Sequence, residues 1–191
     1  MALKLIFLER YKFCYNVVMQ NNKIDKNLIT NFYEKVASKE LPEIFLMTLP
    51  ITLIQKSIFT HAESYLKEKF DLLHSEVDVL ASLHTHDKEL SPTQLYDLTI
   101  FSSGGMTKVL KRLEQRGLIY RKADTKDKRC ILVCITQEGD KLIAQVLFEI
   151  SQECSSYFEV LDKEEKELFS TLLKKVLVNI NALECTSKAK S

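Results

Sequence analysis

Residues 102–136 read SSGGMTKVLKRLEQRGLIYRKADTKDKRCILVCIT, and this stretch decides the fold. In its first half the apolar residues recur at helical spacing, so that at 100° per residue they form one stripe. The stripe consists of Met106, Val109, Leu110 and Leu113. Gly117 stands where the end of a helix favours glycine. The pattern predicts an amphipathic helix from about Ser103 to Arg116.

The second half of the stretch predicts a β-hairpin. The segments LIYRK and CILVCIT are rich in residue types that favour strands, and they flank the charged segment ADTKDKR. Two such runs around a short polar segment are typical of a hairpin. We therefore expect two paired strands with a basic tip.

Upstream, residues 91–94 read SPTQ, which is a capping box with proline at the first helical position. The Ser91 side chain can accept a hydrogen bond from the backbone, and Gln94 can reach back to the start of the helix. This signal predicts a short helix that ends near Leu98. Two helices joined by a tight turn make a helix-turn-helix.

Helical periodicity also dominates the flanking sequence. Pro50 either starts or kinks the long helix in which it lies, while Thr136 and Asp162 cap the last two helices. The expected helices outside the helix-turn-helix are residues 4–20, 25–38, 44–69, 75–83, 137–157 and 162–183. A helix-turn-helix followed by a hairpin and a long helix is a winged helix, so the fold class is mainly α with a small β-hairpin.

The same pattern divides the chain into parts. We expect residues 1–42 as an N-terminal helical extension, 43–70 as the first flanking helix, 71–136 as the winged helix-turn-helix, 137–185 as the C-terminal helices and 186–191 as a polar tail.

The net charge of the chain is only +1, but its basic residues are concentrated. Residues 102–129 contain nine Lys or Arg against three acids, a net charge of +6 that leaves −5 for the remainder. Binding to nucleic-acid phosphates needs such a local positive charge rather than a basic average. A solvated charged surface is the alternative interpretation.

The predicted helix carries its basic residues opposite the apolar stripe. Gly104 and Gly105 share that face at the helix N-terminus, where unpaired amides and the helix dipole favour phosphate, and bare glycine lets the helix approach DNA closely. Relief of crowding at a tight turn is the alternative reason for the pair. Base readout then falls on side chains further along the helix. The candidate DNA-contact residues are Ser102, Ser103, Gly104, Gly105, Thr107, Lys108, Lys111 and Arg112.

The hairpin supplies a second candidate contact. Arg129 can enter a minor groove, where a narrow A·T-rich geometry attracts arginine, and Asp127 can hold its side chain in place. A plain solvated turn is the alternative. The candidate wing residues are Arg121, Lys122, Lys126, Asp127, Lys128 and Arg129.

These residues resemble the winged helix-turn-helix core of the MarR family of bacterial transcription regulators. In that family the recognition helix ends R-L-E-x-R-G-L-I, the wing reads D-x-x-D-x-R and the next strand closes with T-x-x-G. Here these motifs are residues 112–119, then Asp124, Asp127 and Arg129, then Thr136 and Gly139. The resemblance covers about residues 44–183. Glycines 104 and 105 replace the polar or β-branched residues usual in the family, and the extension before residue 43 is longer than usual.

The resemblance implies a homodimer whose winged helix-turn-helix core is flanked by N- and C-terminal dimerisation helices. It implies a transcriptional regulator that binds double-stranded DNA at a pseudo-palindromic operator with half-sites about one helical turn apart. Many family members are repressors released by a small apolar or phenolic effector, and others respond to oxidation of cysteine. We therefore expect a repressor released by a small-molecule ligand or by oxidation.

Five scattered cysteines without a C-x-x-C pair indicate neither a disulfide framework nor a zinc ribbon. The candidate redox residues are Cys14, Cys130 and Cys134; for Cys14 the alternative is a buried small hydrophobe. Cys130 and Cys134 would lie about 13 Å apart along one strand, too far for a mutual disulfide within that strand, and a bridge between two subunits is the alternative. The four histidines lack a carboxylate or cysteine at ligand spacing, so we expect no metal and no cofactor.

Enzyme motifs are absent from the sequence: it has no phosphate-binding loop, no G-x-S-x-G and no H-E-x-x-H. The alternatives to a DNA-binding regulator are a thiol-based enzyme and a winged helix used only for protein contacts. The longest uncharged run, residues 44–55, is too short to span a membrane, and the N-terminal apolar run is too short for a secretory signal. The expected location is therefore the cytoplasm.

Overall fold

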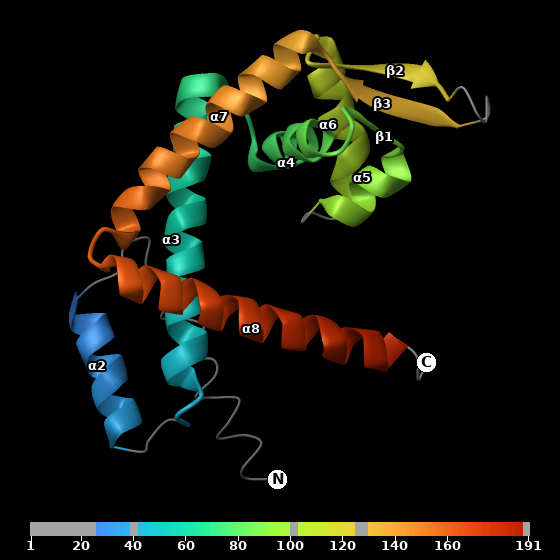
Figure 1. Cartoon of the computed structure of the whole chain (residues 1–191). Helices are drawn as coiled ribbons and strands as arrows, with labels where there is room; N and C mark the ends of the chain where they lie inside the picture. The colour runs from blue at the N-terminus through green and yellow to red at the C-terminus, as the bar shows by residue number, and fades with distance from the viewer. Residues whose placement is uncertain (1–25, 39–41, 100–102, 125–129, 189–191) are drawn as a thin grey trace. The chain divides into compact units, whose positions relative to one another are not determined.

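The computed structural model describes residues 26–38, 42–99, 103–124 and 130–188. The fold is mostly helical with one small antiparallel sheet (Figure 1). In chain order the elements are α2 (Lys26–Ala37), α3 (Phe45–Phe70), α4 (His74–Thr85), β1 (Glu89–Leu90), α5 (Pro92–Leu98), α6 (Ser103–Gln115), β2 (Ile119–Ala123), β3 (Ile131–Ile135), α7 (Gln137–Ser155), a 3-10 turn (Ser156–Phe158) and α8 (Lys163–Lys188). The chain divides into two compact units, residues 1–143 and 144–191.

Helices α4, α5 and α6 and the sheet form the winged helix of the first unit, which confirms the predicted fold class. Their shared core is built from aliphatic side chains, among which Leu80, Leu95 and Leu113 are fully buried. The predicted stripe of α6 lies in this core, and each of its four residues is 8% exposed or less. Burial of that stripe fixes which face of α6 points outward.

The sheet has the strand order β1-β3-β2, and both pairings are antiparallel. The β2–β3 pairing confirms the predicted hairpin, with Ile119 opposite Ile135 and Ala123 opposite Ile131. Strand β1 is an addition that the sequence did not reveal. It is two residues long, so it carries no alternating pattern, and it lies in the polar segment THDKEL.

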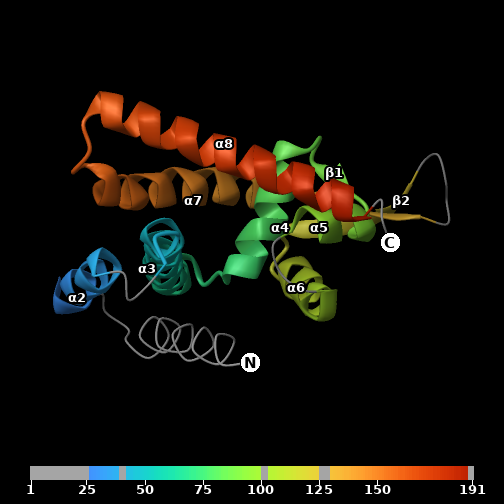
Figure 2. The ribbon, with the colours of Figure 1, turned by 90° about the horizontal axis from the view of Figure 1, so that it is seen from below.

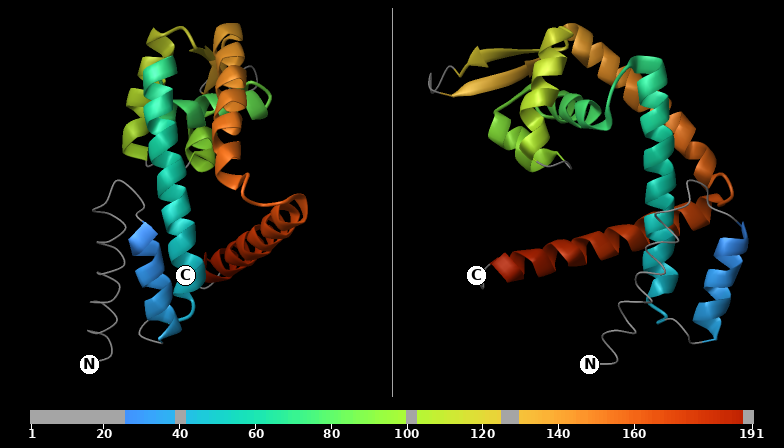
Figure 3. Two further views of the ribbon diagram at one scale, coloured as in Figure 1. Left: turned by 90° about the vertical axis from the view of Figure 1, so that its left-hand side faces the viewer. Right: turned by 180° about the vertical axis from the view of Figure 1, so that it is seen from behind.

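Helix α2 packs along α3 (Figure 2; Figure 3). Val36 and Leu49 form the buried centre of this contact, and the partly buried residues around them are Phe32, Phe45, Leu46 and Leu53. Helix α3 begins five residues before Pro50, so the proline lies inside the helix and does not start it. The helix predicted over residues 4–20 lies outside the described residues.

Three predicted helix starts are confirmed as side-chain caps. Ser91 accepts from the Gln94 amide at 3.2 Å while the Gln94 side chain accepts from the Ser91 amide at 2.9 Å. Asp162 and Glu165 make the same reciprocal pair at the start of α8, at 2.8 and 2.9 Å. Thr136 accepts from the Gly139 amide at 3.0 Å. Helix α8 runs to Lys188, beyond the predicted end at residue 183, because no glycine or proline follows to stop it.

Candidate nucleic-acid interface

Helix α6 presents a polar face away from its buried stripe. Thr107, Lys108 and Lys111 are exposed there, Gly105 is half-buried, and Met106 next to it belongs to the core. Ser102 lies outside the described residues, and Ser103 and Gly104 are described only as the first helical residues of α6. The exposed part of the predicted contact set therefore gathers on one helical face.

Arg112 differs from these lysines because its guanidinium is bound within the chain. Its Nη2 donates to the backbone carbonyl of Asp71 at 2.8 Å and to the Asp71 carboxylate at 2.9 Å. Its Nη1 lies 3.2 Å from the carboxylate of Glu76. The DNA contact predicted for Arg112 remains a prediction, but the structure shows this side chain anchoring α6.

The end of α6 is closed by a left-handed glycine. Gly117 has φ +69°, its amide donates to the Glu114 carbonyl at 3.0 Å, and the Leu118 amide donates to the Leu113 carbonyl at 3.0 Å. These two bonds make a Schellman motif, which satisfies the last carbonyls of a helix. The chain passes directly from this motif into β2, so α6 and the β2–β3 hairpin are joined by a short turn that these two backbone hydrogen bonds hold.

The base of the wing holds two of its predicted cations in ion pairs. Arg121 lies 3.4 Å from the carboxylate of Glu114, which ties β2 to α6. Lys122 pairs with Glu89, which ties β2 to β1 across the sheet. The remaining predicted wing residues, Lys126, Asp127, Lys128 and Arg129, lie outside the described residues. Arg121 and Lys122 are both partly exposed, so each ion pair lies at the surface.

The T-x-x-G motif closes the winged helix onto α7. The Thr136 hydroxyl donates to the carbonyls of Gly117 and Leu118, at 2.8 and 3.1 Å, and the Thr136 amide donates to the Leu118 carbonyl at 3.0 Å. A Cβ on Gly139 would lie 2.2 Å from the Leu118 carbonyl oxygen. Glycine is therefore required at this position by the close approach of α7 to the end of α6.

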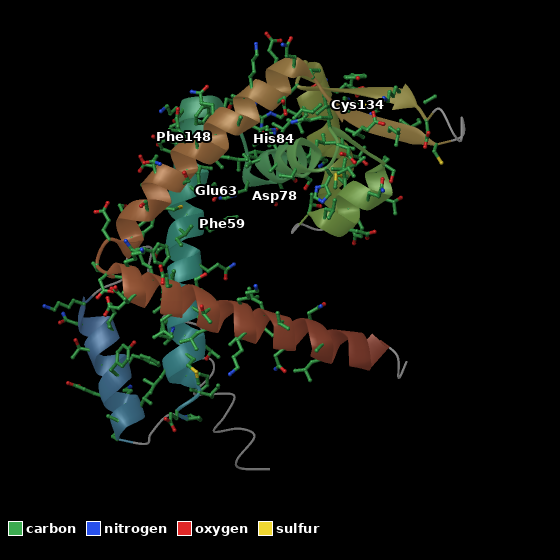
Figure 4. The ribbon with its side chains drawn as sticks, viewed as in Figure 1. Phe59, Glu63, Asp78, His84, Cys134 and Phe148 are labelled. Carbon is green, nitrogen blue, oxygen red and sulfur yellow. The ribbon has the colours of Figure 1, made fainter. Side chains whose placement is uncertain are left out.

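A cluster that sequence reasoning missed joins α4 to the first turn of α7. Asp140 Oδ1 lies 2.6 Å from His84 Nδ1 and 2.5 Å from Lys88 Nζ (Figure 4 labels His84). Hydrogen bonds from Lys88 and then His84 lower the pKa of the Asp140 carboxyl. Only the proximity of α4 and α7 brings these residues together, because Lys88 and His84 lie 52 and 56 residues from Asp140 in the chain.

No group of three or more potential metal ligands occurs among the residues that the structure describes. His84 is engaged with Asp140, and the ring of His74 stacks on Phe59 with centroids 4.0 Å apart. The expectation of no metal site therefore stays a prediction for the chain as a whole.

The cysteine candidates lie in different environments. Cys134 is buried on β3 (Figure 4), and burial raises the pKa of its thiol. Cys130 is exposed directly before β3, and Cys14 lies outside the described residues. Because the thiolate is the reactive form, the raised pKa of Cys134 disfavours oxidation there.

Comparison with known proteins gives the family. The family model for MarR matches residues 72–131. The HTH-type transcriptional regulator MhqR of Bacillus subtilis is 33% identical over 125 residues, which cover 65% of this chain and 84% of MhqR. The chain belongs to the MarR family. The regulator SarZ of Staphylococcus aureus is 30% identical over 117 residues, which cover 61% of this chain and 77% of SarZ.

A solved structure agrees with this assignment. Wild-type MarR from E. coli, in its apo form, superposes with a TM-score of 0.60 at 25% identity, covering 72% of this chain and 98% of MarR. This member of the MarR family is thus a DNA-binding transcriptional regulator of the helix-turn-helix type, as the sequence predicted. Among the described helices, none is both long and apolar enough to cross a bilayer.

Proposed function

We propose that this MarR-family regulator binds a pseudo-palindromic operator as a homodimer, with α6 in the major groove and the wing at the adjacent minor groove. The observation that carries this proposal is the exposed polar face of α6. Its apolar stripe is buried, so the orientation of the helix is fixed with Thr107, Lys108 and Lys111 outward. A solvent-facing helix with this set of donors is suited to reading base edges and phosphates.

The beginning of α6 supports close approach to DNA. The first four amides of a helix lack partners within it, and together with the helix dipole they favour a phosphate. Gly105 adds no side chain at this end. Since glycine supplies no hydrogen bond to a base, specificity there depends on groove shape and on Thr107, Lys108 and Lys111.

Dimerisation is supported by the second unit. Its helix α8 carries an apolar row that is 45% to 65% exposed, formed by Leu168, Leu172, Val176, Leu177, Ile180 and Leu183. Exposed apolar surface of this extent marks a contact site in a water-soluble protein. We assign this row to a second copy of the chain, which would place two α6 helices on two half-sites.

Regulation follows from the family resemblance. We propose a repressor that leaves its operator when a small apolar or phenolic effector binds or when a cysteine is oxidised. For the oxidation route, Cys130 is the described candidate because it is exposed, whereas Cys134 is buried with a raised thiol pKa.

The first experiment is a fluorescence-anisotropy titration of the protein with duplex from its own upstream region and with a scrambled duplex. Both are measured at two salt concentrations. We expect tighter binding to the upstream duplex and a steep loss of affinity with salt, because phosphate neutralisation releases counterions. Equal weak binding to both, with no salt dependence, would favour a winged helix used for protein contacts.

Matched variants locate the contact. Lys108→Ala and Lys111→Ala should weaken binding, and each should reduce the salt slope by about 1 where a phosphate contact is lost. Lys174→Ala is the control, because it removes the same charge from an exposed position of α8. A loss in Lys174→Ala equal to the losses in the α6 variants would show that net charge, not the face of α6, drives binding.

A further inference from the structure

Two arginines at the end of the recognition helix hold the end of another helix. Arg116 Nη1 donates to the Asp71 carbonyl at 2.8 Å and Arg116 Nη2 donates to the Phe70 carbonyl at 3.0 Å. Arg112 donates to the same Asp71 carbonyl and to the Asp71 carboxylate. Both arginines therefore bind the C-terminal end of α3, where the last carbonyls lack helical partners and the dipole favours cations.

Asp71 is the centre of this contact. It adopts a left-handed conformation, with φ 50° and ψ 39°, and ends α3. The Leu72 amide then donates to the Leu66 carbonyl at 3.1 Å, which turns the chain toward α4. The Asp71 carboxylate also pairs with Lys67 from one turn earlier. One residue thus closes α3, begins the connection to α4 and supplies two acceptors to α6.

The Arg112 guanidinium also reaches the start of α4. Glu76 is fully buried, accepts from the Leu73 amide at 2.8 Å and lies 3.2 Å from Arg112 Nη1. Among the described residues it is the only buried charged side chain. A buried carboxylate is stable only when it is paired. Arg112 therefore joins three helices, α3, α4 and α6, through groups that belong to the protein itself.

We propose that Asp71 is a positioning residue for DNA recognition, which with Arg112 and Arg116 locks the recognition helix α6 to the end of α3. The lock fixes the angle at which the lysine-bearing face of α6 is presented. This inference rests on the proposed function, because the angle matters only if α6 meets DNA. It adds a residue that touches no nucleic acid and whose loss nevertheless weakens binding.

The sign of the effect distinguishes positioning from simple electrostatics. Removing an acid from a DNA-binding protein reduces repulsion from phosphates, so charge alone predicts that Asp71 variants bind DNA more tightly. If Asp71 positions α6 through its contacts with Arg112 and Arg116, Asp71 variants should instead bind DNA more weakly. The salt slope should stay at the wild-type value, because no cation that neutralises a phosphate is removed.

The test uses Asp71→Gly and Asp71→Asn in the full chain, because both residues tolerate the left-handed conformation at this position. Asp71→Gly removes the carboxylate acceptor and should raise the Kd for the upstream duplex about 2- to 30-fold. Asp71→Asn keeps an acceptor oxygen for Arg112 and should recover most of that loss. Asp97→Asn is the control. It removes the same charge from α5, where the described structure shows no ion pair for Asp97, and its Kd should stay level or fall.

The outcomes separate the two proposals. If the wild-type protein shows no preference for the upstream duplex, the proposed function fails and the lock fails with it. If the wild-type protein binds specifically while Asp71→Gly binds equally well or better, only the lock is overturned. The titrations are made at a temperature where melting curves show that every variant is folded, and light scattering checks that each variant has the mass of the dimer. With both controls met, a loss of DNA affinity is assigned to the orientation of α6.

Discussion

Helices α6 and α8 are both amphipathic, yet they satisfy their apolar faces in different ways. The stripe of α6 is 8% exposed or less, whereas the row on α8 is 45% to 65% exposed. The C-terminal end of α6 is also held by neighbouring segments, through the Schellman turn at Gly117 and the arginine contacts to α3. The contrast indicates that the winged helix buries the apolar stripe of α6 with its own residues, whereas the row on α8 is the surface that we propose to be covered in the dimer.

The largest expected effect is on the free energy of unfolding, from a change in the buried stripe of α6. Leu113→Ala should lower the free energy of unfolding by about 2 to 5 kcal/mol, because it opens a cavity at a fully buried position of α6. Urea denaturation measures it. Leu177→Ala, at a position of α8 that is 65% exposed in the single chain, is the matched control and should cost far less at a protein concentration low enough to keep the chain monomeric. Equal losses would remove the distinction between the two helices.

On the α8 side, Leu172→Asp should weaken self-association by about 2 kcal/mol or more, because it places a carboxylate in the apolar row. Analytical ultracentrifugation over a range of concentrations gives the dimer Kd. Ser170→Asp introduces the same charge at an exposed polar position of the same helix. An unchanged dimer in Leu172→Asp, or an equal loss in Ser170→Asp, would show that the row is not the interface.

Two glycines in the winged helix, Gly117 after α6 and Gly139 in the first turn of α7, are expected for different reasons. At Gly139 an added side chain would clash, whereas at Gly117 it would be strained by the backbone conformation. Gly139→Ala should cost about 1 to 3 kcal/mol, because its Cβ would meet the Leu118 carbonyl at 2.2 Å. Gly117→Ala should cost about 1 kcal/mol, since φ is +69° but nothing lies within 4 Å of the added atom. Thermal unfolding compares them. A larger loss of stability in Gly117→Ala than in Gly139→Ala would show that the start of α7 can move away from the Leu118 carbonyl at little cost.

The smallest expected effect concerns pH and the cluster of Asp140 with His84 and Lys88. The pKa of the Asp140 carboxyl is lowered in the folded state, so the folded state binds fewer protons than the unfolded state between that lowered pKa and the ordinary value of 3.8. Its stabilisation is present above the ordinary value of 3.8 and is lost as pH falls through the lower folded-state pKa. Asp140→Asn should therefore flatten the fall in Tm as the pH drops below the ordinary carboxyl value of 3.8.

Asp97→Asn is the control for the pH series, because Asp97 is an exposed acid without a described ion pair. An Asp140→Asn curve that runs parallel to the wild-type curve at every pH would show that this cluster does not contribute to acid sensitivity.

Much of the winged helix could be predicted from local signals. The SPTQ box, the spacing of the α6 stripe, Gly117 and the two β-prone runs each act within a few residues, and the structure confirms all of them. Strand β1 could not be predicted, because a two-residue strand is defined by its partner β3 and not by its own pattern.

The candidate site was predictable only in part. Helical periodicity places Lys108 and Lys111 outward, because the stripe opposite them must be buried. The same periodicity groups Arg112 with the lysines, since it reports the face of a helix and not the partner of a side chain. That partner is Asp71, 41 residues away, and only the packed structure shows the contact.

The Leu118 carbonyl has a consequence for the order in which the protein folds. It accepts from both the amide and the hydroxyl of Thr136, 18 residues later, so these bonds form only after the wing has closed. Short loops of this kind close quickly, in contrast to the 41-residue separation between Arg112 and Asp71. We therefore expect the α6–wing–α7 segment to assemble first as a local nucleus, with attachment to α3 as a later step.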